Sequence, residues 1–438
     1  MMTGFERIRA TIAGGHPLRG TYGAPGAKNA VLPMMAASLL TDETCVIQNV
    51  PIISDVLIMA ELLRRLGADV VLDEQAHTVA ITAANVGSTN PDPTLARRMR
   101  ASFQVTGPLL ARFGRFDCAS PGGCQLGSRP VSVDIAGFTQ MGAVVALADE
   151  VFHAEADALY GQRVYLDYPS HTGTQNLLMA ATLANGFTTI VHASREPEVI
   201  ALVHFLRGMG AEIHGEGTSV IGVQGRDRLF GATSRAIPDR IVTGTMAVAT
   251  ALTGGDVELL NIRPDHLEPV TAQLRQMGVS ITETNRSVRV VGTDRPSATD
   301  VQVMPFPGFP TDVQAPIGVL MTQAHGASTI VERVYDGNMG YLEHLAAMGA
   351  NVKVDGSRAV ITGPRLLRGR HLDLWGDIRG SAAMALAGLV AEGETVLDGF
   401  EVVRRGYQDL AGDLQSLGAS VRTAVSYTHL TLPTNREV

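Results

Sequence analysis

The sequence predicts an α/β protein made of six repeated units, arranged as two lobes of three units each. Three observations predict this fold. A motif of an apolar residue, two further residues, Leu or Met, Gly and then Ala or Val occurs six times. An Ala- and Leu-rich stretch that runs through a small turn into a β-branched strand precedes several of the copies. A stretch with linker composition separates the third copy from the fourth.

The glycines of the repeated motif have nearly constant spacing, at 75, 68, 68, 71 and 69 residues. A glycine after an apolar helix end tolerates φ > 0 and commonly closes the helix. The period is longer than the roughly 20–50 residues of common solenoid repeats, so we favour compact units over a stacked array. The six glycines are Gly67, Gly142, Gly210, Gly278, Gly349 and Gly418.

Each unit is expected to carry two helices and several strands. A helix followed by a strand is indicated in four stretches, 179–191, 247–259, 318–331 and 382–397. The strand after the motif glycine is illustrated by 350–354, where apolar and polar residues alternate.

Two crossings between the lobes are predicted, one in the linker at 231–238 and one where Gly and Pro cluster at 20–26. Such crossings would form a hinge with the active site in the cleft. We therefore expect an N-terminal lobe over 22–236, and a C-terminal lobe made of 1–21 together with 237–425.

The composition is that of a folded protein, with 45% hydrophobic and 18% charged residues among 438. The net charge of −8 excludes an overall basic surface for nucleic acid or anionic lipid, so any anion must be bound by locally concentrated arginines. The most apolar run, 382–391, is half the roughly 20 residues of a membrane span. Together with few cysteines and the absence of a signal-peptide core in 1–15, this predicts a cytoplasmic protein.

Residues 426–438 match neither repeated feature. They resemble translated library-adapter sequence, and we expect them to be a non-native tail without a role in function.

Charge and glycine interrupt the apolar pattern at Lys28 and Asn29, just before a helix-like run. A lysine there can hold an anion with the help of free backbone N–H groups, although a lone lysine at a helix start is usually only solvated. Asp312 also enters a helix-like run and is interpreted first as a helix cap. As a general base it would need a substrate hydroxyl within hydrogen-bond reach.

The loop 120–130 contains three glycines, two prolines and Cys124, which lies five residues before Arg129. A cysteine near an arginine in such a loop has a route to a lowered thiol pKa, and we favour this over a chance surface cysteine. Four arginines lie in separate units, and each alone is typical of a surface. If they converged on one cleft, they would clamp carboxylate and phosphate groups. They are Arg100, Arg129, Arg379 and Arg405.

Together these segments resemble the enolpyruvyl transferases, and among them the UDP-N-acetylglucosamine 1-carboxyvinyltransferases of peptidoglycan synthesis. The resemblance covers residues 5–422, and its most specific part is the cysteine loop, which the shikimate-branch sister enzymes lack. It implies an inside-out α/β barrel in each lobe. The motifs, in order, are Gly-Ala-Lys-Asn, Met-Arg-Ala-Ser, Pro-Gly-Gly-Cys-x-x-Gly-x-Arg-Pro, Pro-Asp-Arg-Ile-x-Thr-Gly-Thr, Phe-Pro-Thr-Asp and Arg-Gly-Tyr.

The resemblance implies transfer of the enolpyruvyl group of phosphoenolpyruvate to the 3′-hydroxyl of UDP-N-acetylglucosamine, with release of phosphate. It implies that Lys28, Cys124 and Asp312 are catalytic. Cys124 would act in proton transfer, form an adduct with phosphoenolpyruvate and be alkylated by fosfomycin, and Asp312 would take the proton of the sugar hydroxyl. We expect no cofactor or metal, and no nucleic-acid, membrane or obligate protein partner.

The same resemblance implies two sets of binding residues. Phosphoenolpyruvate would be held by Lys28, Asn29, Arg129, Arg379 and Arg405. The UDP-sugar would be held by Arg100, Arg129, Pro130, Val131, Ser132, Val133, Asp312 and Val334.

Three positions depart from the family pattern. Asn338 stands where an arginine is usual, which predicts weaker binding of phosphoenolpyruvate and a lower KM in Asn338→Arg. Tyr168–His171 stand in the uridine-contacting stretch without its usual lysine, and Arg404 replaces an acidic residue and would add compensating positive charge. These departures leave open a paralogue that acts on another nucleotide in specialised metabolism. A non-catalytic nucleotide-binding regulator is the third alternative.

Overall fold

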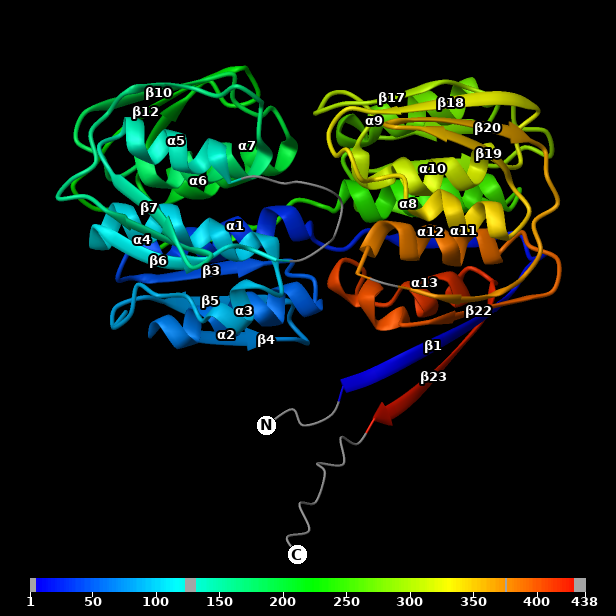
Figure 1. Ribbon diagram of the computed structural model, residues 1–438, viewed down its shortest axis with the longest axis horizontal. Coiled ribbons are helices and arrows are strands. Elements are labelled where there is room, and N and C mark those ends of the chain that lie inside the picture. The colour runs from blue at the N-terminus through cyan, green and yellow to red at the C-terminus, as the bar shows by residue number, and fades with distance from the viewer. Residues whose placement is uncertain (1–4, 123–130, 375, 429–438) are drawn as a thin grey trace, which may run out of the picture.

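The computed structural model of the protein describes residues 5–122, 131–374 and 376–428. Within them, six β-sheets are divided equally between two lobes that lie side by side (Figure 1). The buried apolar side chains form two separate clusters, one drawn from 27–236 and the other from 8–24 together with 241–421. This grouping supports the predicted division of the chain at 22 and 236, which remains a prediction. In the described residues no helix is both long and apolar enough to cross a bilayer.

The N-terminal lobe contains sheets of strand order β13-β3-β5-β4, β6-β8-β7 and β11-β12-β10-β9. Its strands are β3 (Thr44–Gln48), β4 (Asp69–Asp73), β5 (Thr78–Thr82), β6 (Arg115–Ala119), β7 (Val144–Ala148), β8 (Val151–Glu155), β9 (Arg163–Tyr165), β10 (Phe187–Val191), β11 (Glu212–His214), β12 (Val220–Gln224) and β13 (Thr233–Arg235). Its α-helices are α1 (Lys28–Ala37), α2 (Ser54–Leu66), α3 (Pro93–Ala96), α4 (Thr106–Phe113), α5 (Ser132–Gln140), α6 (His171–Ala181) and α7 (Pro197–Gly208), and its 3₁₀ turns are Ser38–Leu40 and Arg100–Val105.

The C-terminal lobe contains sheets of strand order β15-β16-β14-β2, β17-β18-β20-β19 and β21-β22-β1-β23. Its strands are β1 (Phe5–Ala13), β2 (Arg19–Gly23), β14 (Asp256–Leu260), β15 (Ser280–Glu283), β16 (Ser287–Val291), β17 (Val301–Val303), β18 (Gly326–Glu332), β19 (Asn351–Asp355), β20 (Arg358–Gly363), β21 (His371–Asp373), β22 (Glu394–Asp398) and β23 (Ser420–Thr428). Its α-helices are α8 (Arg240–Leu252), α9 (Pro264–Gln276), α10 (Gln314–Met321), α11 (Tyr341–Ala347), α12 (Ile378–Gly388) and α13 (Leu410–Ser416), and its 3₁₀ turns are Thr311–Val313 and Phe400–Arg405.

Five of these sheets share one pattern, in which the pair of strands at one end of the sheet is parallel and the other two pairs are antiparallel. The N-terminal segment completes two of the units in the C-terminal lobe. β2 pairs in parallel with β14, and β1 lies between β22 and β23. In the same way, β13 from the end of the N-terminal lobe pairs in parallel with β3 at its beginning.

The repeat glycines end helices as the sequence predicts. All six have φ between 88° and 107°, a region that disfavours residues with a Cβ atom. β23, however, continues three residues beyond the predicted boundary at 425, because β1 offers it a pairing partner as far as Phe5, which lies opposite Thr428.

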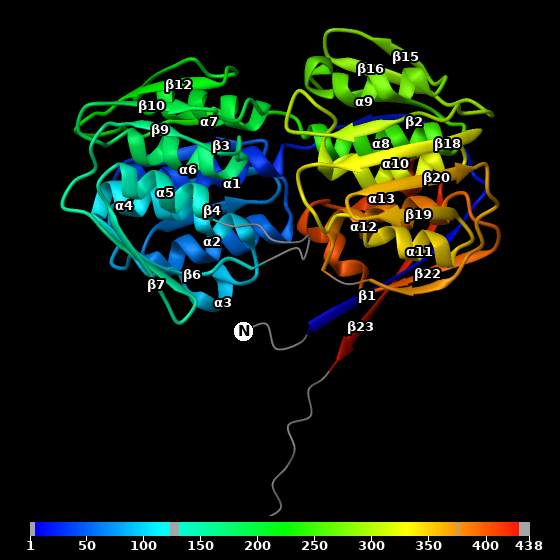
Figure 2. The same cartoon turned by 45° about the horizontal axis from the view of Figure 1, so that its top comes forward.

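The helices at the centre of each lobe are surrounded by sheets, which confirms the predicted inside-out α/β fold (Figure 2). Every residue of α8 and α12 is buried. Such helices are rich in Ala, Gly and other small residues, and a helix that is apolar on all sides belongs in the interior.

The two chain crossings lie side by side and are hydrogen-bonded to each other. Gly26 forms a bridge with Pro238, and the Ala27 amide donates to the Ile237 carbonyl at 2.8 Å. A Cβ atom on Gly26 would lie 1.6 Å from the Asn49 carbonyl oxygen, so only glycine fits there. Because α1 and α8 begin directly after these crossings, the first residues of both helices are held next to the boundary between the lobes.

Candidate active site

A cleft of about 610 Å³ lies between the lobes and is lined by residues of both. Its volume is in the usual range for small-molecule sites. Several central helices begin at this cleft. Lys28, His171 and Arg240 are the first residues of α1, α6 and α8, and Arg379 is the second residue of α12. Helix N-termini carry partial positive charge, so this arrangement favours anionic ligands.

Lys28, Asp55 and Arg405, which we call the lysine cluster, join the two lobes. Lys28 Nζ lies 2.6 Å from Asp55 Oδ2, and Arg405 Nε lies 3.0 Å from Asp55 Oδ1. Burial alone would raise the pKa of Asp55, but the charges of Lys28 and Arg405 outweigh it and hold the pKa below its usual value. Burial lowers the pKa of Lys28. Asp55 opposes this effect, and the nearby charges of Arg379 and Arg405 add to it.

Arg379 connects the lysine cluster to Asp312. Its Nη2 lies 3.1 Å from Asp312 Oδ2, and its guanidinium lies 5.1 Å from the centre of the Tyr407 ring. Burial would lower the pKa of Arg379, but Asp312 and other neighbours raise it above its usual value, so the group stays charged. Asp312 does not act as the predicted helix cap. Neither its own 3₁₀ turn nor α10 has a side-chain cap, and its carboxylate faces Arg379 in the cleft.

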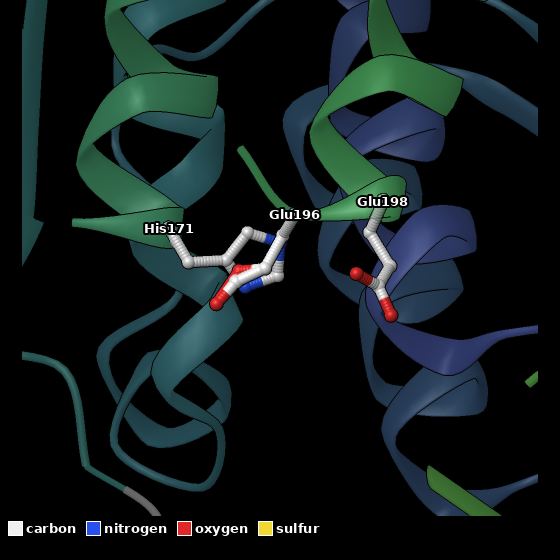
Figure 3. Close-up of side chains that lie close together, drawn as sticks. All are labelled: His171, Glu196 and Glu198. Atoms are coloured by element: carbon white, nitrogen blue, oxygen red, sulfur yellow. The ribbon is translucent and has the colours of Figure 1, made fainter. Parts of the chain in front are cut away.

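His171, Glu196 and Glu198 lie close together (Figure 3). With Arg240, which binds Glu198, they form a second group that we call the histidine cluster. Arg240 comes from the C-terminal lobe and donates to both oxygens of Glu198 in the N-terminal lobe, at 2.9 and 3.3 Å. The ligand atoms of His171, Glu196 and Glu198 all lie within 4.8 Å of one another, a spacing that could hold a metal ion. Both oxygens of Glu198 are already bound by Arg240, however, and its positive charge opposes a cation at this position.

The cleft brings together most of the sequence-predicted site residues. Val131 does not line it and instead packs in the core of the N-terminal lobe, 8% exposed. Cys124, Arg129 and Pro130 lie outside the described residues. The predicted residues that line the cleft are Lys28, Asn29, Arg100, Ser132, Val133, Asp312, Val334, Arg379 and Arg405.

The other two cysteines are buried in strands. Cys45 in β3 and Cys118 in β6 are both fully buried. Burial raises the pKa of the Cys45 thiol, and it raises the pKa of the Cys118 thiol to about 12. Both thiols are therefore protonated at neutral pH and are poor nucleophiles.

The three departures from the family pattern lie in different surroundings. Asn338 is 2% exposed and does not line the cleft, because its amide donates to Thr311 and Glu332. Arg404 is exposed and is likewise not among the cleft residues. Neither Asn338 nor Arg404 contacts the cleft, so the weaker binding of phosphoenolpyruvate expected from the missing arginine, and the lower KM of Asn338→Arg, stay predictions. Tyr168 and His171, in contrast, do line the cleft.

Sequence reasoning missed Asp55, Glu198, Arg240 and Arg333 as residues of the site. Asp55 and Glu198 occur in the first turns of α2 and α7, where acidic residues are common for electrostatic reasons alone. Arg240 falls within the Pro-Asp-Arg-Ile motif, and this motif is the sequence signal that could have identified it as a site residue.

Known proteins resemble this chain in both sequence and structure. The sequence model of a family described as EPSP synthase (3-phosphoshikimate 1-carboxyvinyltransferase) matches residues 12–414. The chain belongs to this family. A UDP-N-acetylglucosamine 1-carboxyvinyltransferase of Halothermothrix orenii is 42% identical over 94% of this chain and 98% of its own. A UDP-N-acetylglucosamine 1-carboxyvinyltransferase 1 of Halalkalibacterium halodurans is also 42% identical, over 95% of each chain.

Two solved structures share the architecture. The enolpyruvyl transferase NikO from Streptomyces tendae superposes with a TM-score of 0.87 at 25% identity, covering 96% of this chain and 99% of its own. An EPSP synthase from Acinetobacter baumannii superposes with a TM-score of 0.72 at 17% identity, over 95% of this chain and all of its own, and shows the fold alone.

Proposed function

We propose that this chain transfers the enolpyruvyl group of phosphoenolpyruvate to the 3′-hydroxyl of UDP-N-acetylglucosamine and releases phosphate. The proposal rests on a cleft in which three cations converge, in a chain that is 42% identical over nearly its whole length to UDP-N-acetylglucosamine 1-carboxyvinyltransferases. Lys28, Arg379 and Arg405 approach one another from the two lobes, as the trianionic donor requires.

In the addition step, the sugar hydroxyl attacks C2 of phosphoenolpyruvate while C3 gains a proton, which gives a tetrahedral phospho-ketal. Asp312 is proposed to accept the hydroxyl proton, since its carboxylate lines the cleft and is turned toward Arg379. Lys28, Arg379 and Arg405 would neutralise the carboxylate and phosphate of the donor as charge shifts between them.

In the elimination step, C3 loses a proton, the bond between C2 and the phosphate oxygen breaks, and inorganic phosphate leaves. Cys124 is proposed to act in proton transfer, and Arg129 to balance the charge of the donor. Both assignments rest on the family resemblance, because both residues lie outside the described part of the chain.

The test is release of inorganic phosphate from phosphoenolpyruvate, measured with and without UDP-N-acetylglucosamine, with mass spectrometry of the product. We expect release only with the acceptor, and one enolpyruvyl ether formed per phosphate. No release at any substrate concentration would contradict the proposal and would favour a non-catalytic regulator.

A second candidate is enolpyruvyl transfer to another nucleotide. It is favoured by Tyr168 and His171, which line the cleft where the family pattern has other residues. The same assay with a panel of nucleotide acceptors separates the two candidates. A kcat/KM that is higher for another nucleotide than for UDP-N-acetylglucosamine would select the second.

The proposed reaction would be the first committed step of peptidoglycan synthesis, in the cytoplasm, and fosfomycin would inhibit it by alkylating Cys124. Buried Cys45 and Cys118 serve as internal controls. We expect peptide mass spectrometry to find the adduct on Cys124. Alkylation should be faster when the UDP-sugar is bound. An adduct on either buried cysteine would contradict this assignment.

A further inference from the structure

Arg333 differs from four other basic residues that line the cleft, Lys28, Arg240, Arg379 and Arg405. Lys28 and Arg405 bind Asp55, Arg240 binds Glu198, and Arg379 binds Asp312. Arg333 is exposed and lines the same cleft, but its side chain has no carboxylate partner among the described residues. Its charge is therefore available to a ligand.

The neighbouring carboxylate, Glu332, is fully engaged elsewhere. It is 2% exposed, and its Oε1 accepts from the Val334 and Tyr335 amides at 2.7 and 3.2 Å. Its Oε2 accepts from Thr311 Oγ1 at 2.8 Å and from Asn338 Nδ2 at 3.3 Å. These four bonds fix the loop after β18 and occupy both oxygens of Glu332, so Arg333 projects from a fixed loop without an ion pair to its neighbour.

A helix N-terminus in the same cleft also suits an anion. Tyr168 lines the cleft together with Arg333 and Tyr335, and α6 begins three residues later at His171, which lines it too. Burial, together with the nearby Tyr335, Glu196 and Glu332, raises the pKa of Tyr168, so its hydroxyl stays protonated and can donate a hydrogen bond. The cations nearest the donor surround Asp55 and Asp312, whereas Arg333 lies next to Val334, where the sugar nucleotide is expected.

We propose that Arg333 binds a phosphate group of the acceptor and so makes the cleft selective for a nucleoside diphosphate. The inference rests on the proposed function for the identity of the acceptor. Arg333 would act in binding and would not touch the reacting atoms.

The test compares Arg333→Gln with Arg358→Gln, a matched control at an exposed arginine of β20 that does not line the cleft. Calorimetry with UDP as the probe should show affinity weakened about 10- to 100-fold in Arg333→Gln, the usual effect of losing a charged hydrogen bond. The control should bind as the wild type does, and Arg333→Lys should recover part of the loss. In the phosphate-release assay, KM for UDP-N-acetylglucosamine should rise by a similar factor, while kcat and KM for phosphoenolpyruvate stay within about twofold.

Unchanged UDP affinity in Arg333→Gln, or equal weakening in the control, would overturn the inference and leave the proposed function standing. If KM rises for phosphoenolpyruvate instead, Arg333 binds the donor, and the inference is overturned as well. If the wild type binds UDP but does not turn over UDP-N-acetylglucosamine, the proposed function fails, while the calorimetric comparison still decides the role of Arg333. If the wild type binds no UDP, both fail.

Discussion

The lysine cluster and the histidine cluster both join the lobes through an arginine of the C-terminal lobe and a buried carboxylate of the N-terminal lobe. Their charge balance differs. In the lysine cluster, Lys28 and Arg405 share the single carboxylate of Asp55, which leaves one positive charge in excess. In the histidine cluster, Arg240 faces two carboxylates, Glu196 and Glu198.

What a cluster can bind depends on how many carboxylates its cations already contact, and not only on whether it contains an arginine. A paired buried charge mainly holds the lobes together, because its interaction energy is used within the protein. A cation without its own carboxylate can neutralise a substrate. We therefore propose that the lysine cluster binds the anionic donor, and that the histidine cluster connects the lobes and shapes the cleft.

The largest expected effect concerns Asp312, whose charge reaches both Arg379 and Arg240. Asp312→Asn keeps the size of the side chain and removes the base. We expect kcat to fall about 100- to 10,000-fold, as for loss of a general base, with KM values little changed. Steady-state phosphate release measures both quantities. A kcat within tenfold of the wild type would show that another group accepts the proton.

The next effect separates the structural role of the histidine cluster from a binding role. Arg240→Gln leaves Glu198 buried without its partner, and we expect a loss of about 3–5 kcal/mol in stability. The double variant Glu198→Gln/Arg240→Gln removes both charges and should lie within about 1 kcal/mol of the wild type. Thermal and denaturant unfolding measure the difference. Equal stability of the single and double variants would mean that the pair does not hold the lobes together.

The smallest effect is a pH dependence from Lys28. Only the protonated amine neutralises the donor, and its pKa is lowered, so the charge is lost at a lower pH than for a lysine in water. KM for phosphoenolpyruvate should therefore rise with increasing pH, about tenfold per unit above the pKa of Lys28. Lys28→Arg should move this rise to higher pH. A profile that is the same in both proteins would assign the titration to another group.

Much of the fold was predictable because its signals are local. The repeat glycines each end a helix in the left-handed region. The stretch predicted as a linker, 231–238, contains the second crossing at Ile237 and Pro238, but its residues Thr233–Arg235 form β13, because they pair with β3. Lys28, Arg379 and Arg405 stand near glycine in apolar surroundings and through the family resemblance became candidates, and all three line the cleft. That they bind phosphoenolpyruvate stays a prediction.

The rest depends on contacts between distant parts of the chain. Asp55 looks like an ordinary acidic residue at a helix start, and only the approach of Arg405, 350 residues away, gives it a role. Asn338 is predicted to mark a lost substrate contact, but nothing in the sequence indicates that its amide would bond Glu332 and so fix the loop that follows β18. No period or spacing in the sequence encodes either pairing.

The most direct test of the difference between the two clusters is KM for phosphoenolpyruvate at saturating UDP-N-acetylglucosamine, measured in Arg405→Gln and in the double variant Glu198→Gln/Arg240→Gln. We expect KM to rise by about tenfold or more in Arg405→Gln, because a charged contact to the donor is lost, and to stay within about twofold in the double variant. An equal rise in both, or a rise only in the double variant, would contradict the assignment of the donor to the lysine cluster.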